Sequence, residues 1–382
     1  MPRLFGERIR LPQIFAAMLL GFFLTQSLWF VSRVNLAENE GLILQAGAAQ
    51  LRGQWMANTE QHSPLVSLLA ALPVIGKDTN NAYLMARNRW LIRAPFLFMG
   101  VMLGGSLWYV ARRLYGNTGG YIALLLYIFS PFIIIRSSVL QPDIAAAWGV
   151  FGLIFTGIAV AHTLYAPREV VLWNWKRILL LGISIGIALA AQYSTAWLLV
   201  LALLFMLWLA PVRRPAAVVI LLAACLVGLI VLSLTFVPQP LEMFGALRHS
   251  LWGELNFRNL FRVGSWRLLG HFYWDNSAPA LLLLLVSLVG YAVWPRTRYF
   301  GTTAPLLAAI ACVLLSLLMP LVGGLTFLFV SLPFVYVFIA GVFTDLLDTR
   351  YSTAFAGALV GALLTHGIAS AMGLIQLTHL TR

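Results

Sequence analysis

The chain has 382 residues, of which 61% are hydrophobic and only 10% are charged. A water-soluble protein of this length could not bury so much apolar surface, so lipid must be the solvent for most of the chain. The formal net charge of +13 comes mostly from arginines at the ends of apolar segments, which favours anionic lipid headgroups or a phosphorylated lipid as partners and argues against nucleic acid.

The N-terminus, MPRLFGERIRLPQIFAAMLLGFFL, places basic residues before an apolar core, as a signal peptide does. The apolar run continues to about Val31 without a clear small-residue cleavage site, so we interpret it as a retained first membrane helix. Cys225 and Cys312 both lie inside apolar runs, which argues against a disulfide framework or a metal site.

Apolar runs long enough to approach the thickness of a bilayer predict about eleven transmembrane helices. The fifth and sixth runs are separated only by AQYST and could form a tight hairpin, and the boundary between the ninth and tenth, MPLVGG, is equally short. The sequence therefore predicts an all-α, polytopic membrane protein with helices at 13–32, 94–111, 119–135, 143–164, 178–191, 195–210, 216–237, 278–294, 302–320, 321–343 and 353–377.

The positive charges of the short connections predict the orientation. With a cytoplasmic N-terminus, the pairs Arg112-Arg113 and Arg213-Arg214 fall on the cytoplasmic side, as do the cations of the other short connections there. The opposite side receives little in its short connections except Arg136. We therefore expect a cell (inner) membrane protein with a cytoplasmic N-terminus, an external C-terminus and two long external loops, 33–93 and 238–277.

Both external loops contain amphipathic sequence. Apolar residues at helical spacing predict helices that lie along the membrane surface at 40–52 and 64–75. In the second loop, Arg258 and Arg262 stand one turn apart beside Phe257 and Phe261, which indicates a basic, aromatic surface at headgroup depth. The chain thus divides into a membrane module (1–237), a basic external loop (238–277) and a C-terminal group of helices (278–382).

A series of short motifs follows the first loop. Arg93 opens the second apolar segment, RRLYG follows it, Ser130-Pro131 close the third segment, and Asp143 opens the fourth. This order resembles the polyprenyl-phosphate-sugar glycosyltransferases of the GT-C superfamily, which are related to the protein O-mannosyltransferases and the lipid A aminoarabinose transferases. The resemblance covers roughly residues 10 to 215, including HSPL at 62–65 and a glycine-rich fifth helix, and no single motif in it is specific.

The resemblance implies transfer of a sugar from a polyprenyl-phosphate carrier to an acceptor on the external face. Such a reaction needs a carboxylate as general base, and cations that stabilise the departing phosphate. By this resemblance Glu40 or Glu38 would be the base and Asp143 would orient donor or acceptor. The candidates for binding phosphate or lipid are His62, Arg93, Arg136, Arg258 and Arg262.

Each candidate also has a structural interpretation. Acids just beyond a membrane helix can cap the next helix, and Pro142-Asp143 is an ordinary helix start. Arginines at the ends of membrane helices commonly extend to lipid headgroups. The sequence also departs from the family pattern, since Asn39 stands where relatives prefer Asp, and Gln192 where they often have Lys.

Two functions therefore remain open from the sequence. One is a GT-C glycosyltransferase whose donor is a polyprenyl-phosphate sugar; the other is a catalytically inactive scaffolding subunit of a larger membrane complex, with lipids in the carrier groove. A transporter is disfavoured because His162, His366 and Asp345 lie near helix ends rather than mid-membrane. The sequence predicts no cofactor beyond the donor and decides neither the sugar, the acceptor nor a need for a divalent metal.

Overall fold

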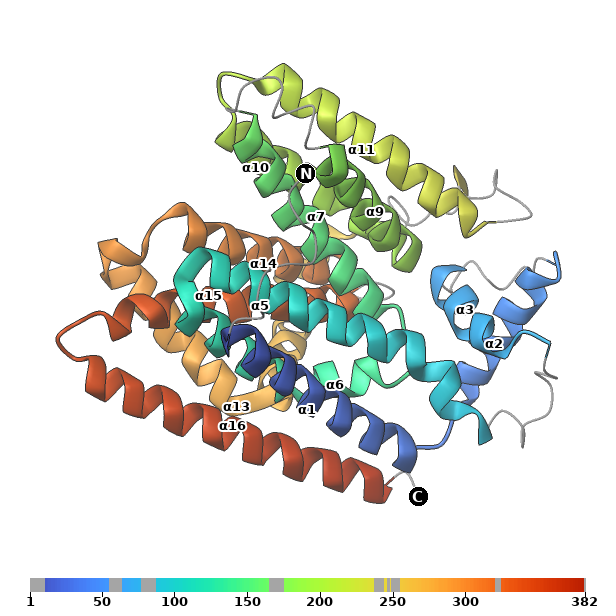
Figure 1. The fold of residues 1–382 in the computed structure, drawn as a ribbon, viewed down its shortest axis with the longest axis horizontal. Coiled ribbons are helices and arrows are strands. Elements are labelled where there is room, and N and C mark those ends of the chain that lie inside the picture. Colours follow the sequence, from blue (N-terminus) through green and yellow to red (C-terminus); the bar gives the residue numbers. More distant parts are fainter. Residues whose placement is uncertain are drawn as a thin grey trace.

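The computed structural model describes residues 11–54, 64–76, 87–164, 175–236, 244–245, 248, 255–319 and 324–380. These residues form helices joined by short connections, and none of them forms a strand (Figure 1). Eight of the helices they form are long and apolar enough to cross a membrane. The chain is thus a multi-pass, all-α membrane protein as predicted, although the predicted number of eleven membrane helices is not confirmed.

The helices follow the predicted apolar segments in order. Four short 3-10 helices extend or precede them: η2 (Leu72–Val74), η3 (Tyr193–Ala196), η4 (Phe257–Phe261) and η5 (Pro295–Thr297). The α-helices are α1 (Leu11–Arg33), α2 (Glu38–Leu51), α3 (Pro64–Ala71), α5 (Arg89–Ile128), α6 (Pro131–Ser137), α7 (Asp143–Thr163), α9 (Trp175–Ala191), α10 (Trp197–Leu209), α11 (Arg214–Leu234), α13 (Val263–Val293), α14 (Phe300–Leu318), α15 (Gly324–Leu347) and α16 (Ser352–Leu380).

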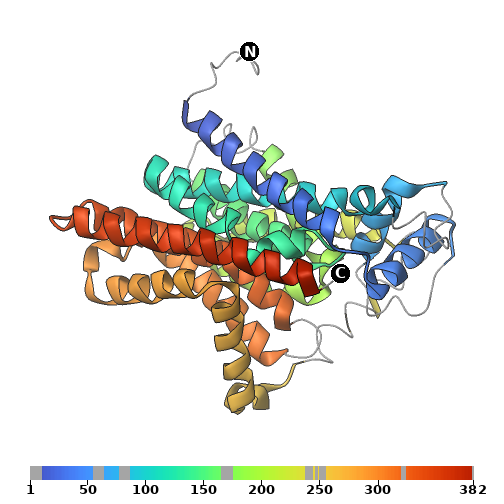
Figure 2. The same ribbon diagram turned by 90° about the horizontal axis from the view of Figure 1, so that it is seen from below.

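Two of the long helices are broken inside. In α5, Gly116 has φ 78° and ψ −173°, a backbone conformation that residues other than glycine rarely adopt. The chain reverses its direction there, between the predicted spans 94–111 and 119–135, so that Tyr127 donates a hydrogen bond to the carbonyl of Gly100. In α13, Ser277 adopts extended backbone angles two residues before Pro279. The part of α13 that precedes Ser277 was predicted as external loop; it is helical, and it leaves the body crosswise to the long helices (Figure 2).

Helix α15 lies at the centre of the molecule. It packs against α14, α5, α7, α13 and α16, and 94% of the residues in its most apolar 18-residue stretch are buried inside the protein. Its sequence, GLTFLFVSLPFVYVFIAGVF, is apolar on every side because every side meets another helix. In the outer helices α1, α11 and α16, a much smaller share of the corresponding residues is buried, and their exposed apolar side chains are left to contact lipid.

Small residues set the close packing of α7, α9 and α11. A Cβ at Gly149 of α7 would lie 2.5 Å from the backbone nitrogen of Ala188 in α9, and Gly182 and Gly186 of α9 meet α11 in the same way. The expected hairpin of the fifth and sixth segments is not formed as two helices packed along each other. Helices α9 and α10 instead both pack on α7, because the extended residue Gln192 and η3 separate them.

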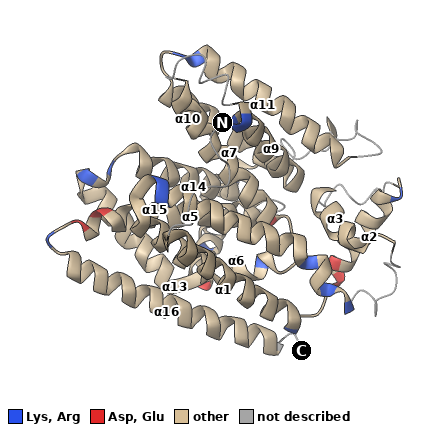
Figure 3. Ribbon diagram, in the orientation of Figure 1, with Lys and Arg blue, Asp and Glu red and all other residues tan. Residues whose placement is uncertain are grey.

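The charged residues gather near the ends of the long helices (Figure 3). One such end carries α2 and α3, both predicted as amphipathic helices and both present. The C-terminal ends of α1 and α16 lie at this same end (Figures 1 and 2), whereas α1 begins at the opposite end. The functional candidates Glu40, Arg93 and Asp143 belong to the end that carries α2.

Candidate functional site

The predicted acid Glu40 forms a buried ion pair with the predicted phosphate ligand Arg93. The guanidinium of Arg93 donates from Nε to Oε1 of Glu40 at 3.0 Å and from Nη2 to Oε2 at 2.5 Å. Arg93 is fully buried and Glu40 is 5% exposed. This two-point geometry matches the planar guanidinium to the carboxylate and is the strongest form of this interaction.

Local sequence positions both partners. Glu40 is the third residue of α2, and its Oε2 accepts the backbone N–H of Ala37 at 2.9 Å, so the side chain also caps the start of the helix. Arg93 lies near the start of α5, and its Nη1 and Nη2 donate to the carbonyls of Val34 and Asn35 at 3.0 and 2.9 Å. The pair therefore fixes the connection between α1 and α2 against α5.

A further hydrogen bond connects Glu40 to the segment between α6 and α7. The backbone N–H of Leu140 donates to Oε1 of Glu40 at 3.0 Å. Glu40 thus accepts four hydrogen bonds, two from Arg93 and one each from Ala37 and Leu140. A carboxylate offers about four acceptor positions, so Glu40 has none left for the proton of a substrate in this arrangement.

The second acid, Asp143, lies three residues beyond Leu140. Its Oδ2 accepts from Nη1 of Arg136 at 2.8 Å, and its Oδ1 accepts from the hydroxyl of Thr326 at 2.6 Å. Arg136 also donates to the side-chain oxygen of Gln141. Asp143 is buried, and these contacts join α6, the start of α7 and the start of α15.

Arg136 differs from Arg93 in having access to the surroundings. Its side chain is 31% exposed, and both of its described contacts use Nη1. Its Nε and Nη2 donate to no residue that the structure describes. Arg136 can therefore keep its ion pair with Asp143 and still present two donor nitrogens, Nε and Nη2, to an anion.

These residues form one polar cluster at the end of the body that carries α2. The segment 138–143 connects its two ion pairs, because Leu140 contacts Glu40 while Gln141 and Asp143 contact Arg136. We call five of the side chains that carry these contacts the external polar cluster, after the side predicted for the first loop: Glu40, Arg93, Arg136, Asp143 and Thr326.

The remaining candidates lie outside the external polar cluster. Glu38 is exposed in the first turn of α2, two residues before Glu40, and Asn39 between them is exposed as well. Arg258 and Arg262 are exposed at η4, at the start of α13. His62 lies outside the described residues.

The sequence did not predict two residues that contact the ion pair of Arg136 and Asp143, Thr326 and Gln141. Thr326 stands near the start of an apolar helix that is far from Asp143 in the sequence, and no local pattern indicates the contact. Gln141 could have been noticed, since it stands two residues before Asp143 in the connection that opens α7. Within the described ranges, no three His, Cys, Asp or Glu side chains lie close enough together to hold a metal ion.

Comparisons with known proteins concern part of the sequence and the fold of the chain. A family model described as dolichyl-phosphate-mannose-protein mannosyltransferase matches residues 81–236, which include Arg93, Arg136 and Asp143. Among curated protein sequences, none matches the chain.

Solved structures share the fold at low sequence identity. The Archaeoglobus fulgidus oligosaccharyltransferase in complex with Zn and sulfate is similar with a TM-score of 0.59 at 15% identity, over 92% of this chain and 53% of that one. The oligosaccharyltransferase AglB from Archaeoglobus fulgidus, in complex with an inhibitory peptide and a dolichol-phosphate, gives a TM-score of 0.56 at 13% identity, over 94% of this chain and 56% of that one. ArnT from Cupriavidus metallidurans bound to undecaprenyl phosphate gives 0.55 at 14% identity, over 91% and 62%.

The chain has a GT-C fold. It spans between about half and three fifths of the length of these enzymes, so the likeness covers only part of each of them. The resemblance inferred from Arg93, RRLYG, Ser130-Pro131 and Asp143 is therefore confirmed at the level of fold.

Proposed function

We propose that this protein is a membrane glycosyltransferase that moves a sugar from a polyprenyl-phosphate carrier to an acceptor on the external face. The observation that carries the proposal is the external polar cluster itself. In a chain with a GT-C fold, it brings the first loop, the start of α5 and the connection between α6 and α7 to one place. Solved relatives of this fold hold a dolichol-phosphate or undecaprenyl phosphate.

We propose different roles for the predicted residues. Glu40 and Arg93 act as positioning residues, because each is buried and their mutual contacts leave Glu40 no acceptor position. Arg136 is the candidate for contacting the carrier phosphate, held in place by Asp143. Glu38 is the candidate for the general base, since it is the exposed carboxylate nearest in sequence to this cluster.

We further propose that the end with α2 and α3 faces outward and that the N-terminus is cytoplasmic. The arginine pairs of the short connections support this orientation through the positive-inside rule. The external polar cluster would then meet carrier and acceptor at the outer leaflet.

The reaction can be tested on the purified full chain in nanodiscs. The assay offers a panel of polyprenyl-phosphate sugars and measures release of the sugar-free polyprenyl phosphate. We expect turnover with at least one donor, a loss of at least 100-fold in Arg136→Ala, and a similar loss in Glu38→Gln. Arg296→Ala is the matched control, because this arginine lies between α13 and α14 in an exposed ion pair with Asp348.

A second function has specific support. Glu40 and Asp143 are both engaged in internal contacts, and Asn39 stands where the family prefers Asp, which favours an inactive scaffolding subunit. Such a subunit would purify from native membranes with a stable partner at fixed stoichiometry and would release no carrier from any donor. Turnover that survives unchanged in Arg136→Ala and Glu38→Gln would remove our assignment of both residues.

A further inference from the structure

A second candidate site lies where α13 bends. The part of α13 before the bend, residues 263–276, projects from the body crosswise to the long helices (Figure 2); we call it the α13 arm. Phe272 and Asn276 of the arm are buried against the body. The other side of the arm is exposed and carries Trp266 and Trp274, which are 50% and 59% exposed.

The exposed side of the α13 arm carries a row of charges at helical spacing. Arg267, His271 and Asp275 follow one another at intervals of four residues, so they lie about one turn apart along one side of the helix. All three are exposed, and none forms an ion pair or hydrogen bond with another residue that the structure describes. Gly270 leaves a hollow between Arg267, His271 and Trp274.

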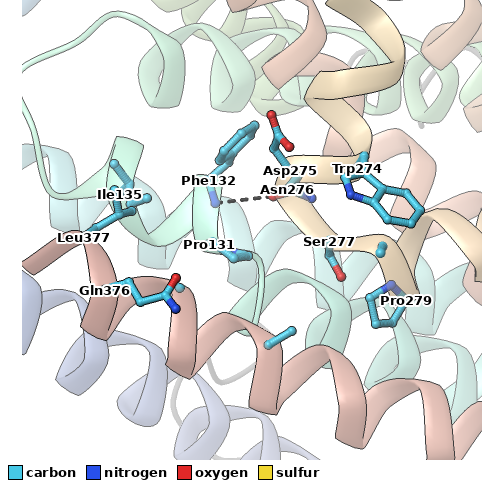
Figure 4. A pocket seen from close by; sticks show the side chains of 13 residues that line it. Pro131, Phe132, Ile135, Trp274, Asp275, Asn276, Ser277, Pro279, Gln376 and Leu377 are labelled. Atoms are coloured by element: carbon cyan, nitrogen blue, oxygen red, sulfur yellow. Dashed lines mark hydrogen bonds between the residues drawn. The ribbon is translucent and has the colours of Figure 1, made fainter.

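An apolar cavity of about 370 Å³ adjoins this row at Trp274 and Asp275 (Figure 4). Pro131, Phe132 and Ile135 of α6 form one wall, and α16 forms another with Ala369, Gly373, Gln376 and Leu377. The space beside Gly373 is open, since a Cβ built there would meet nothing within 4 Å. The cavity does not include Glu40 or Asp143, and it is therefore separate from the external polar cluster.

Hydrogen bonds fix the walls of this cavity. The Oδ1 of Asn276 accepts from the hydroxyl of Ser130 at 2.8 Å and from the backbone N–H of Phe132 at 3.3 Å. The hydroxyl of Ser277 lies 2.6 Å from Nδ1 of His366 in α16 and accepts the N–H of Ala280 at 3.2 Å. His366 lies in the middle of α16, so the expectation that it stands near a helix end is wrong. These hydrogen bonds hold the bend of α13 to α6 and α16, so the helices that line the cavity are fixed relative to one another.

We propose that the α13 arm and this cavity bind one phospholipid of the phosphatidylethanolamine type. Its phosphate would lie between Arg267 and His271, its ammonium group would pair with Asp275 one turn further along, and one acyl chain would enter the cavity. The side chains along the arm follow the order guanidinium, imidazole, carboxylate. This order complements a phosphate joined to an ammonium group by a short link, because guanidinium and imidazole N–H groups donate to phosphate and a carboxylate accepts from ammonium. The exposed tryptophans agree, since tryptophan is enriched at membrane interfaces.

The chemistry separates this lipid from its competitors. An anionic phospholipid such as phosphatidylglycerol satisfies Arg267 and His271 but leaves Asp275 without a cation. A choline headgroup carries a charge without N–H donors, so it cannot hydrogen bond to the Asp275 carboxylate. We therefore expect preference for a primary ammonium headgroup, independent of whether the chain transfers sugars.

Native mass spectrometry of the delipidated full chain tests the site. Equal amounts of phosphatidylethanolamine, phosphatidylglycerol, phosphatidylcholine and undecaprenyl phosphate are offered, and retained lipids are counted. We expect one phosphatidylethanolamine to be retained in preference to the others. Arg267→Gln should weaken its retention about tenfold, the effect of losing one charge-assisted hydrogen bond.

Two further variants separate the contribution of the lipid headgroup from that of the acyl chain. Asp275→Asn should abolish the preference for phosphatidylethanolamine over phosphatidylglycerol, because it lowers the retention of phosphatidylethanolamine without lowering that of phosphatidylglycerol. Gly373→Leu should fill the cavity and lower the retention of every phospholipid, whereas Gly361→Leu, at another open position on α16, should not. Equal retention of all four lipids by the wild type, preferential retention of undecaprenyl phosphate, or full retention in Gly373→Leu would overturn the proposal.

Discussion

Removal of the Glu40 carboxylate should destabilise the protein strongly, because it would leave Arg93 charged and buried. Arg93 is fully buried, and two of its donors now contact Glu40. Breaking one side of a buried ion pair costs about 3–5 kcal/mol in comparable proteins. Glu40→Ala also leaves the N–H groups of Ala37 and Leu140 without their acceptor, so we expect the upper part of this range.

The assay is thermal unfolding of the purified chain in detergent, followed by intrinsic tryptophan fluorescence. For a chain of this size we expect the midpoint of Glu40→Ala to fall by about 5 °C. Arg296→Ala is the matched control, because its partner Asp348 lies at 3.4 Å in an exposed ion pair, and such pairs contribute about 0–1 kcal/mol.

A double-mutant cycle tests the cause of the loss. The two single changes, Glu40→Leu and Arg93→Met, each leave one buried charge without its partner, whereas the double change removes both charges. We therefore expect the double variant to lose clearly less stability than the sum of the two single variants. Additive losses, or a Glu40→Ala midpoint no lower than that of Arg296→Ala, would refute the assignment of Glu40 and Arg93 as a structural pair.

Three further predictions concern other parts of the fold. Thr326→Val removes the hydroxyl that donates to Asp143 at 2.6 Å; we expect a loss of about 1–2 kcal/mol by thermal unfolding, and Thr326→Ser should restore most of it. Gly149→Leu should prevent a monodisperse peak in size-exclusion chromatography, because even a Cβ there would overlap the backbone of α9, whereas Gly157→Ala should be tolerated since its nearest neighbour is 3.8 Å away. Arg33→Cys should react with a membrane-impermeant maleimide added to intact cells, and labelling only after permeabilisation would reverse our orientation.

The helices themselves could be predicted from the sequence. An apolar segment must satisfy its backbone hydrogen bonds internally when lipid surrounds it, so hydrophobicity alone predicts a helix. The amphipathic pattern likewise predicted α2 and α3. The order of Arg93, RRLYG, Ser130-Pro131 and Asp143 resembles that of the GT-C glycosyltransferases, and it was this resemblance that predicted the GT-C fold.

The partners of the charged side chains were decided only by the tertiary structure. Nothing in the sequence near Glu40 indicates that its carboxylate forms an ion pair with Arg93, 53 positions away, or that it accepts a hydrogen bond from the N–H of Leu140. Asp143 and Thr326 meet only because α15 passes through the centre of the body. Composition fixed lipid as the solvent, and local patterns fixed the helices. Packing determined which charges are satisfied inside the protein and which, such as Arg136, remain open to a ligand.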